Sequence, residues 1–150
     1  PVERGEPAPR PSSDVSLRYD ASQLLLDHRA VADGTSGQLL DARGAPRYRG
    51  DTEPLDRAAG HVPGALNRPF ADNLDANGHF KPAVQLRAEF TAVLGATEPS
   101  HVVHMCGSGV TACHNLLAME HAGLHGSRLY APSWSGWVSD PSRPVATGEE

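Results

Sequence analysis

Short apolar runs alternate with stretches of helical periodicity along most of the chain. The runs at 38–42, 101–105 and 128–131 suit buried β-strands, because each is brief and rich in apolar residues. The stretches at 21–32 and 83–94 place apolar residues at the spacing of one helix face, which is typical of amphipathic α-helices. Strands that alternate with helices predict an α/β fold, in which a mainly parallel central sheet carries helices on both faces.

Weaker segments complete this pattern. Residues 15–19 are expected to form a short strand, and Asp20 is expected to be the N-cap of the helix over 21–32. Residues 66–69 suit an edge segment of the sheet. Residues 133–138 suit a short helix that packs tryptophan against the core.

The length of 150 residues is enough for one domain with a hydrophobic core. We interpret residues 1–14 as a proline-rich linker or tail, 15–140 as the domain and 141–150 as a polar C-terminal tail. The formal net charge of −5 gives no electrostatic reason to expect binding to nucleic acid or to an anionic membrane. No apolar run reaches membrane-spanning length, and two cysteines make no disulfide framework, so a reducing, cytoplasmic setting is expected.

The clearest chemical signal is the cysteine that follows the run at 101–105. Cys106 opens a loop of small residues, Gly107, Ser108 and Gly109, which leads into a helix. Free loop amides and the positive end of a helix dipole both favour thiolate over thiol, so Cys106 is expected to be a nucleophile. The alternative is a buried structural cysteine, which is the common fate of this residue type.

The helix after the loop carries further polar groups. Thr111 is predicted to cap this helix, which is expected to continue to Gly123. The hydroxyls of Ser108 and Thr111 can donate to a thiolate, a persulfide or a substrate, and the alternative for both is turn and cap duty. Cys113 is interpreted as a small hydrophobe within the helix, with redox pairing to an oxidised Cys106 as the alternative.

A group of arginines follows the strand at 38–42. Its members are Arg43, Arg47, Arg49 and Arg57. A guanidinium group grips a carboxylate or a sulfur oxyanion through two hydrogen bonds, so these residues suggest a small anionic substrate. The alternatives are solvated surface arginines and, for Arg43, an internal ion pair with Asp41 or Glu53.

The histidines do not form a pattern typical of metal sites. His61 could be a general base or a metal ligand, but a structural role on a tight loop is the favoured interpretation. His101 and His104 would point to opposite faces of a strand, so no metal site is predicted. The chain also has no dinucleotide or triphosphate fingerprint and no Cys-x-x-Cys, so no cofactor is expected.

The segment Cys106-Gly-Ser-Gly-Val-Thr-Ala112 resembles the active-site loop of 3-mercaptopyruvate sulfurtransferases in the rhodanese superfamily. Matching segments at 40–43, 47–50, 52–54, 60–65 and 133–137 follow in the family's order, so the resemblance covers residues 15–140. In thiosulfate-preferring rhodaneses the loop carries charged residues after the cysteine. Gly107 and Ser108 are neutral, which favours mercaptopyruvate as the donor.

The resemblance implies a rhodanese-like fold and a role for each matching residue. Cys106 would carry sulfur as a persulfide, Ser108 would assist proton transfer, and Arg47 and Arg57 would hold the carboxylate of a small anionic sulfur donor. The remaining loop positions implied in substrate binding are Gly107, Gly109, Val110 and Thr111. A thiol, cyanide or a thioredoxin-like protein would accept the sulfur.

Two departures from the family pattern leave alternatives open. The first departure is Asp51, an extra residue before Thr52. The second is that the family's enzymes usually hold two rhodanese domains in tandem, so a second rhodanese domain is an implied partner. The alternatives are a thiosulfate sulfurtransferase, and a half-enzyme or interaction domain that is inactive without that second domain. Related phosphatases need Cys-x5-Arg, and Ala112 replaces that arginine here.

Overall fold

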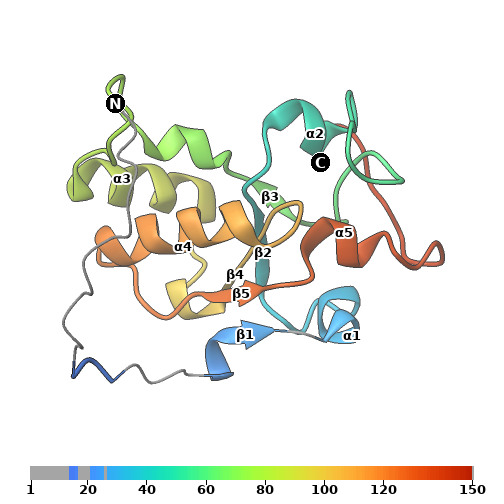
Figure 1. The fold of residues 1–150 in the computed structure, drawn as a ribbon, viewed down its shortest axis with the longest axis horizontal. Helices are drawn as coiled ribbons and strands as arrows, with labels where there is room; N and C mark the ends of the chain where they lie inside the picture. The colour runs from blue at the N-terminus through green and yellow to red at the C-terminus, as the bar shows by residue number, and fades with distance from the viewer. Residues whose placement is uncertain (1–13, 17–20, 26, 150) are drawn as a thin grey trace, which may run out of the picture.

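The structure is a computed structural model that describes residues 14–16, 21–25 and 27–149. The strands within these residues are β1 (Leu24–Leu25), β2 (Gln38–Asp41), β3 (Leu66–Asn67), β4 (Val102–Met105) and β5 (Arg128–Tyr130). They form one sheet in the order β1-β5-β4-β2-β3, and every neighbouring pair is parallel (Figure 1). The predicted parallel sheet is confirmed, and β3 lies at its edge as expected.

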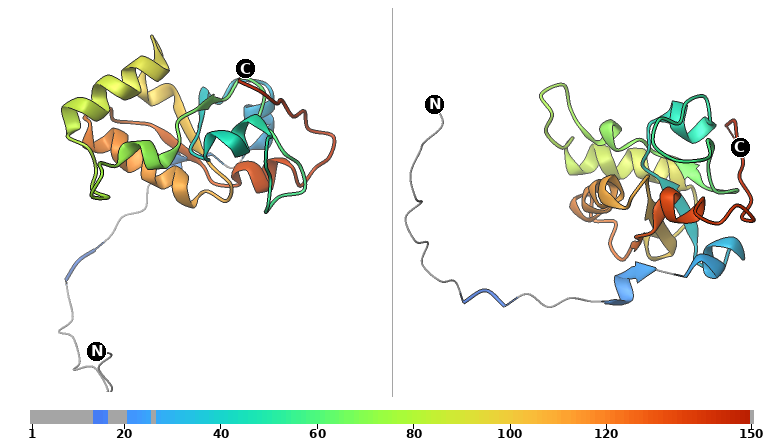
Figure 2. Two further views of the ribbon diagram at one scale, coloured as in Figure 1. Left: turned by 90° about the horizontal axis from the view of Figure 1, so that it is seen from above. Right: turned by 45° about the vertical axis from the view of Figure 1, so that its right-hand side comes forward.

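Helices cover both faces of this sheet. The α-helices are α1 (His28–Ala32), α2 (Ala45–Arg49), α3 (Ala83–Leu94), α4 (Val110–His121) and α5 (Ser133–Trp137), and the 3₁₀-helices are η1 (Ala21–Gln23), η2 (Phe70–Asn73) and η3 (Pro99–His101). Helices α3 and α4 lie side by side on one face, and α1, α2 and α5 lie over the other (Figures 1 and 2). The predicted α/β architecture, with helices on both faces of a parallel sheet, is therefore confirmed.

The sheet separates the two larger hydrophobic clusters of the core. In β2, Leu39 belongs to the cluster that contains Tyr48 and Trp134, whereas Leu40 belongs to the cluster that contains Phe90. Strand β4 alternates in the same way, because successive side chains of a strand point to opposite faces. Burial on both faces explains why these strands are continuous apolar runs in the sequence.

The predicted helix over 21–32 is wrong in its first half. Residues there form η1 and then β1, which pairs with β5. The parallel edge of β5 gives this backbone hydrogen-bond partners that outweigh its local helical pattern. Helix α1 begins later, and its N-cap is Asp27, whose carboxylate accepts the Arg29 N–H at 2.8 Å. Most of the strand expected at 15–19, and the expected N-cap Asp20, lie outside the described residues.

Helix α2 lies where the sequence analysis expected only a loop of arginines. Pro46 stands in its first turn, and Gly50 ends it at φ +85° with its N–H bonded to the Arg47 carbonyl at 3.3 Å. Proline at a helix start and glycine just after its end are a recognised signal in sequences. The helix was overlooked because five residues are too few to show a period.

The remaining elements agree with the predictions to within a few residues. Helix α3 has the predicted bounds, and β2, β4, β5 and α5 end one residue from theirs or closer. Helix α4 ends at His121 rather than at Gly123. No helix in the described part of the chain is both long and apolar enough to cross a bilayer.

The residues after 140 contact the domain closely. The backbones of Ala146 and His61 pair as an antiparallel bridge, and the Gly148 N–H donates to the Arg49 carbonyl at 2.9 Å. This segment runs beside α2 in Figure 2. The proposed domain boundaries at 15 and 140 stay a prediction.

A cluster of charged groups joins α3 to the segment after β3. Glu89 on α3 pairs with Arg68 at 2.5 Å and with Lys81 at 3.0 Å. The Arg68 guanidinium also lies 5.1 Å from the centre of the Phe90 ring. Burial alone would raise the pKa of Glu89, but hydrogen bonds from Arg68, Gln85 and Lys81 lower it from 4.5 to about 2.

We predict that Glu89 contributes stability that is lost in acid. Because its pKa is lower in the folded state, the contribution is present above about pH 4.5 and disappears as the pH falls towards about 2. Glu89→Gln should lower the free energy of unfolding by about 1–3 kcal/mol near neutral pH and by much less near pH 2. Urea unfolding at several pH values measures this, with the exposed Glu149→Gln as the control. Equal losses at both pH extremes would contradict the prediction.

Candidate active site

Cys106 directly follows β4 at the carboxyl end of the parallel sheet. Ligands of such sheets bind at this end, so the position suits a functional residue. The residue is only 2% exposed and packs with Ala42 and Ala112. The loop after it turns into α4, as Figure 1 shows, so the sulfur lies close to the positive end of that helix.

Gly109 connects the sulfur to the helix. Its N–H donates to Cys106 Sγ at 3.1 Å, so a backbone donor is directed at the sulfur. Its φ is +85°, and a Cβ at this position would lie 2.8 Å from the Ala131 carbonyl oxygen, so only glycine fits. Gly109 is also the N-cap of α4, which has no side-chain cap, so the predicted capping role of Thr111 is wrong.

Helix α5 holds the cysteine loop in place through backbone hydrogen bonds. The N–H groups of Trp134 and Ser135 donate to the carbonyls of Cys106 and Gly107, each at 2.9 Å. In the other direction, the Cys106 N–H donates to Ser133 Oγ at 3.1 Å. Sequence reasoning predicted that α5 packs tryptophan into the core, but it missed this contact with the loop.

The backbone of Ser133 is adapted to this contact. Its φ of +51° is the only positive value at a non-glycine residue in the described part of the chain. This conformation costs a non-glycine residue about 1–2 kcal/mol, so the surrounding structure must hold it there. The Ser133 hydroxyl donates to the Tyr130 carbonyl at 3.0 Å, which leaves its lone pairs for the Cys106 amide.

Arg47 lies beside the cysteine loop. An alanine at position 107 would place its Cβ 3.5 Å from Nη1 of Arg47. The Arg47 side chain is 21% exposed, and its guanidinium pairs with Glu53 at 2.6 Å and with Asp56 at 3.2 Å. The structure therefore brings Arg47 to the loop, as the resemblance implied, and its role in binding stays a prediction.

The other arginines have different surroundings. Arg43 is buried, pairs with Asp41 at 2.7 Å and with Glu53 at 3.4 Å, and lies 4.5 Å from the Trp134 ring centre, so the alternative of an internal ion pair holds. Arg49 pairs with the exposed Asp51 at 2.8 Å.

Arg57 is exposed and lines a small pocket of about 70 Å³ with Val138, Asp140 and Arg143. These neighbours belong to the segment that follows α5, rather than to the cysteine loop. Its proposed part in holding a substrate carboxylate stays a prediction.

The loop hydroxyl and the second cysteine are accessible. Ser108 is exposed, and so is Val110, at 73%. Thr111 is half-buried in the first turn of α4. Cys113 lies in α4 as predicted, but its side chain is exposed rather than packed as a small hydrophobe, and its thiol donates to the Gly109 carbonyl at 3.3 Å.

His61 has the surroundings of a structural histidine. Its ring is fully buried and stacks on Tyr48 at a centroid distance of 3.8 Å, and Nδ1 donates to the Tyr48 carbonyl at 2.8 Å. Among the residues that the structure describes, no cluster of three or more histidine, cysteine or acidic side chains could hold a metal ion.

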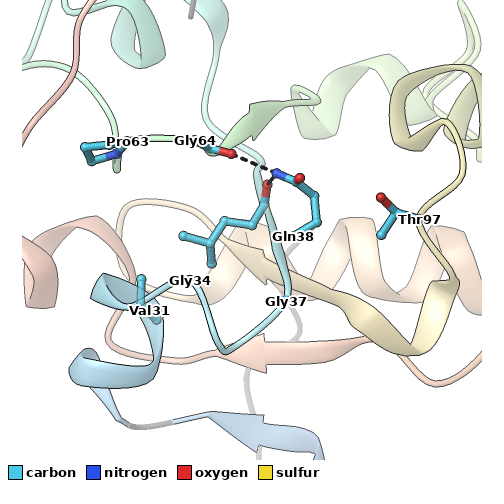
Figure 3. Close-up of a pocket in the computed structure, with 8 residues that line it drawn as sticks. Val31, Gly34, Gly37, Gln38, Pro63, Gly64 and Thr97 are labelled. Carbon is cyan, nitrogen blue, oxygen red and sulfur yellow. Dashed lines mark hydrogen bonds between the residues drawn. The ribbon is translucent and has the colours of Figure 1, made fainter.

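A larger pocket of about 410 Å³ lies at the opposite end of the sheet, where β2 begins (Figure 3). Gln38 crosses it, and its Nε2 donates to the Gly64 carbonyl at 2.8 Å. The other lining residues are Val31, Gly34, Gly37, Leu39, Pro63 and Thr97. None of these side chains is charged.

Comparisons with known proteins find relatives that match most of this chain. Residues 22–140 match the family model of the rhodanese-like domain. The chain is 50% identical over 149 residues to a probable 3-mercaptopyruvate sulfurtransferase of Pseudomonas aeruginosa, covering 97% of this chain and 51% of that protein. It is 38% identical over 143 residues to human 3-mercaptopyruvate sulfurtransferase, covering 91% and 47% of the two chains. The chain thus spans about half the length of these relatives.

A further relative is named for a different sulfur donor, and a solved structure that resembles the chain shares only its fold. The thiosulfate sulfurtransferase of Gallus gallus is 35% identical over 135 residues, covering 88% of this chain and 46% of that protein. Among solved structures, an anaerobic ergothioneine biosynthesis enzyme from Chlorobium limicola superposes with a TM-score of 0.73 over 84% of this chain and 32% of that chain. At 19% identity, this likeness shows the fold alone.

We predict that Gly109→Ala lowers the free energy of unfolding more than the same substitution at a glycine with positive φ and open space around it. The variant combines an unfavourable φ with a clash against Ala131, so the free energy of unfolding should fall by about 2–4 kcal/mol. The control is Gly78→Ala, at φ +78° with no atom within 4 Å, which should lose only about 1 kcal/mol. Urea denaturation measures both values, and equal losses in the two variants would refute the clash.

Proposed function

The chain belongs to the family of rhodanese-like domains, and from this premise we propose that it is a sulfurtransferase. In this proposal it moves sulfane sulfur from 3-mercaptopyruvate, through a Cys106 persulfide, to a thiol or cyanide. The observation that carries the proposal is the sulfur of Cys106 beneath the Gly109 amide, with the Arg47 guanidinium beside Gly107. Relatives named 3-mercaptopyruvate sulfurtransferase support the choice of donor.

The first half-reaction loads the cysteine. The Cys106 thiolate attacks the donor sulfur, the bond from that sulfur to carbon breaks, and the electron pair leaves with the enolate of pyruvate. The enolate takes up one proton, which the exposed hydroxyl of Ser108 helps to deliver. The products are pyruvate and a Cys106 persulfide, which the loop amides and the α4 dipole stabilise.

The surrounding residues bind and orient the donor. Arg47 holds the donor carboxylate through paired hydrogen bonds, and Arg57 assists it. Gly107 and Gly109 leave room for the donor beside the sulfur, and Val110 and Thr111 complete the loop around it.

The second half-reaction unloads the cysteine. A thiol, cyanide or a reduced thioredoxin-like partner attacks the outer sulfur, and the electron pair of the broken S–S bond returns to Cys106 as thiolate. Two half-reactions through one covalent intermediate predict ping-pong kinetics. The two free cysteines suit a reducing, cytoplasmic setting for this cycle.

A second candidate donor is thiosulfate. Relatives named for that activity include the Gallus gallus enzyme and a putative thiosulfate sulfurtransferase of Mycobacterium tuberculosis, 38% identical over 149 residues. The neutral residues after Cys106 favour mercaptopyruvate instead. Because the chain spans about half of its relatives, a second rhodanese domain is a further proposed partner that would complete the donor site.

We predict that reduced protein exposed briefly to 3-mercaptopyruvate gains the mass of one sulfur atom, and that peptide mapping places it on Cys106. Cys106→Ser should gain nothing, whereas Cys113→Ser, the matched control at the exposed cysteine, should gain sulfur like the unmodified chain. Sulfur transfer that persists in Cys106→Ser would refute the proposal. A gain with thiosulfate as well would establish the broader rhodanese activity.

We also predict that Arg47→Lys lowers kcat/KM for 3-mercaptopyruvate about tenfold or more, mainly through KM. Lysine keeps the charge beside Glu53 but loses the planar fork that binds a carboxylate twice. Arg49→Lys, on the same helix and paired with Asp51, is the control and should change kcat/KM less than about twofold. Steady-state kinetics test this, and equal effects of the two substitutions would exclude a role for Arg47 in binding.

A further inference from the structure

The contacts of Arg47 point to a further residue that controls the donor site. We propose that Asp56 is a specificity-determining residue that disfavours donors with two negative charges relative to carboxylates with one. The inference rests on the proposed function and deepens it, because it concerns the same site. No motif in the sequence marks Asp56, and only the folded structure brings it to Arg47.

The guanidinium of Arg47 has one edge occupied and one edge partly occupied. Glu53 accepts from Nε at 3.2 Å and from Nη2 at 2.6 Å, so it fills the first edge. Asp56 accepts from Nη2 at 3.2 Å, and Nη1 lies beside Gly107. The edge made by Nη1 and Nη2 is therefore the one available to a donor bound at the loop, and Asp56 already holds one of its two nitrogens.

Asp56 is held firmly in this position. Its Oδ1 accepts from the Ser135 hydroxyl at 2.6 Å, and its own N–H donates to Glu53 at 3.1 Å. Ser135 in turn donates its N–H to the Gly107 carbonyl at 2.9 Å. The Asp56 side chain is only 12% exposed. It is therefore a fixed part of the wall next to the cysteine loop, where solvent screens its charge less than at the open surface.

The charge balance of this cluster gives Asp56 its effect. Two guanidinium groups, on Arg43 and Arg47, share three carboxylates, on Asp41, Glu53 and Asp56. The cluster thus carries one excess negative charge, and removal of the Asp56 charge would leave it balanced. Every negative charge on a donor is repelled by Asp56, so a dianion such as thiosulfate is repelled more than the monoanionic 3-mercaptopyruvate. At the distances within such a site, one extra charge changes affinity about tenfold.

The substitution Asp56→Asn isolates this effect, because asparagine keeps the shape and can still hydrogen-bond to Ser135. We expect the ratio of kcat/KM for thiosulfate to kcat/KM for 3-mercaptopyruvate, with cyanide as acceptor, to rise about tenfold. High salt should reduce the rise. The matched control is Asp51→Asn, which removes a carboxylate paired with Arg49 at 2.8 Å and should leave the ratio within about twofold. An unchanged ratio, an equal change for both donors, or the same shift in the control would overturn the proposal.

A binding measurement separates this inference from the proposed function. In Cys106→Ser protein, calorimetry with pyruvate as the monoanion and sulfate as the dianion needs no sulfur transfer. Asp56→Asn should strengthen the binding of sulfate about tenfold more than that of pyruvate. If this occurs although the protein with Cys106 intact transfers no sulfur, the inference stands and the proposed function fails. The inference fails if sulfur is transferred but Asp56→Asn leaves both the ratio of kcat/KM values and the relative affinity for sulfate and pyruvate unchanged. It also fails if neither anion binds.

Discussion

The hydrogen bonds between α5 and the cysteine loop fix the backbone on which the candidate site depends. A loop of small residues has little packing of its own, so its shape must come from partners outside it. Trp134 and Ser135 hold the carbonyls of Cys106 and Gly107, and Ser133 holds the Cys106 amide. With these groups fixed, the Gly109 amide and the first turn of α4 lie next to one sulfur atom. In the proposed mechanism, this backbone geometry is what prepares Cys106 as the nucleophile.

The second constraint is a group of charged side chains that joins Asp41, at the end of β2, to Arg43, Glu53 and Arg47. Arg43 is almost fully buried and is satisfied by Asp41, Glu53 and the Gly60 carbonyl. Burial alone would raise the pKa of Glu53, but hydrogen bonds from Arg47 and from the backbone of Leu55 and Asp56 hold it below its ordinary value. An unpaired buried charge would be costly, so these groups position one another. The same pairing keeps the Arg47 guanidinium beside the loop while leaving part of it accessible.

Sequence reasoning succeeded where the signal was local and repeated. The apolar runs at β2, β4 and β5 and the helical spacing of α3 predicted the parallel sheet and most of its cover. It failed for the short elements. Strand β1 forms because it pairs with β5, which the local sequence does not reveal, and the only sequence signals of α2 are the proline at its start and the glycine at its end. For the candidate site, the sequence could single out the cysteine loop and Arg47. It could not reveal Ser133 or Asp56, because the Cys106 amide that Ser133 binds and the Ser135 hydroxyl that Asp56 binds lie 27 and 79 residues away along the chain.

The central claim is that Cys106 carries sulfur between two half-reactions, and a single-turnover measurement tests it most directly. Protein loaded with 3-mercaptopyruvate and freed of excess donor would be mixed with cyanide, and both thiocyanate and the mass of the Cys106 peptide would be measured. The account predicts one thiocyanate for each loaded cysteine and the return of Cys106 to its original mass. Loaded sulfur that stays on the protein, or thiocyanate formed while the Cys106 peptide is unchanged, would contradict it.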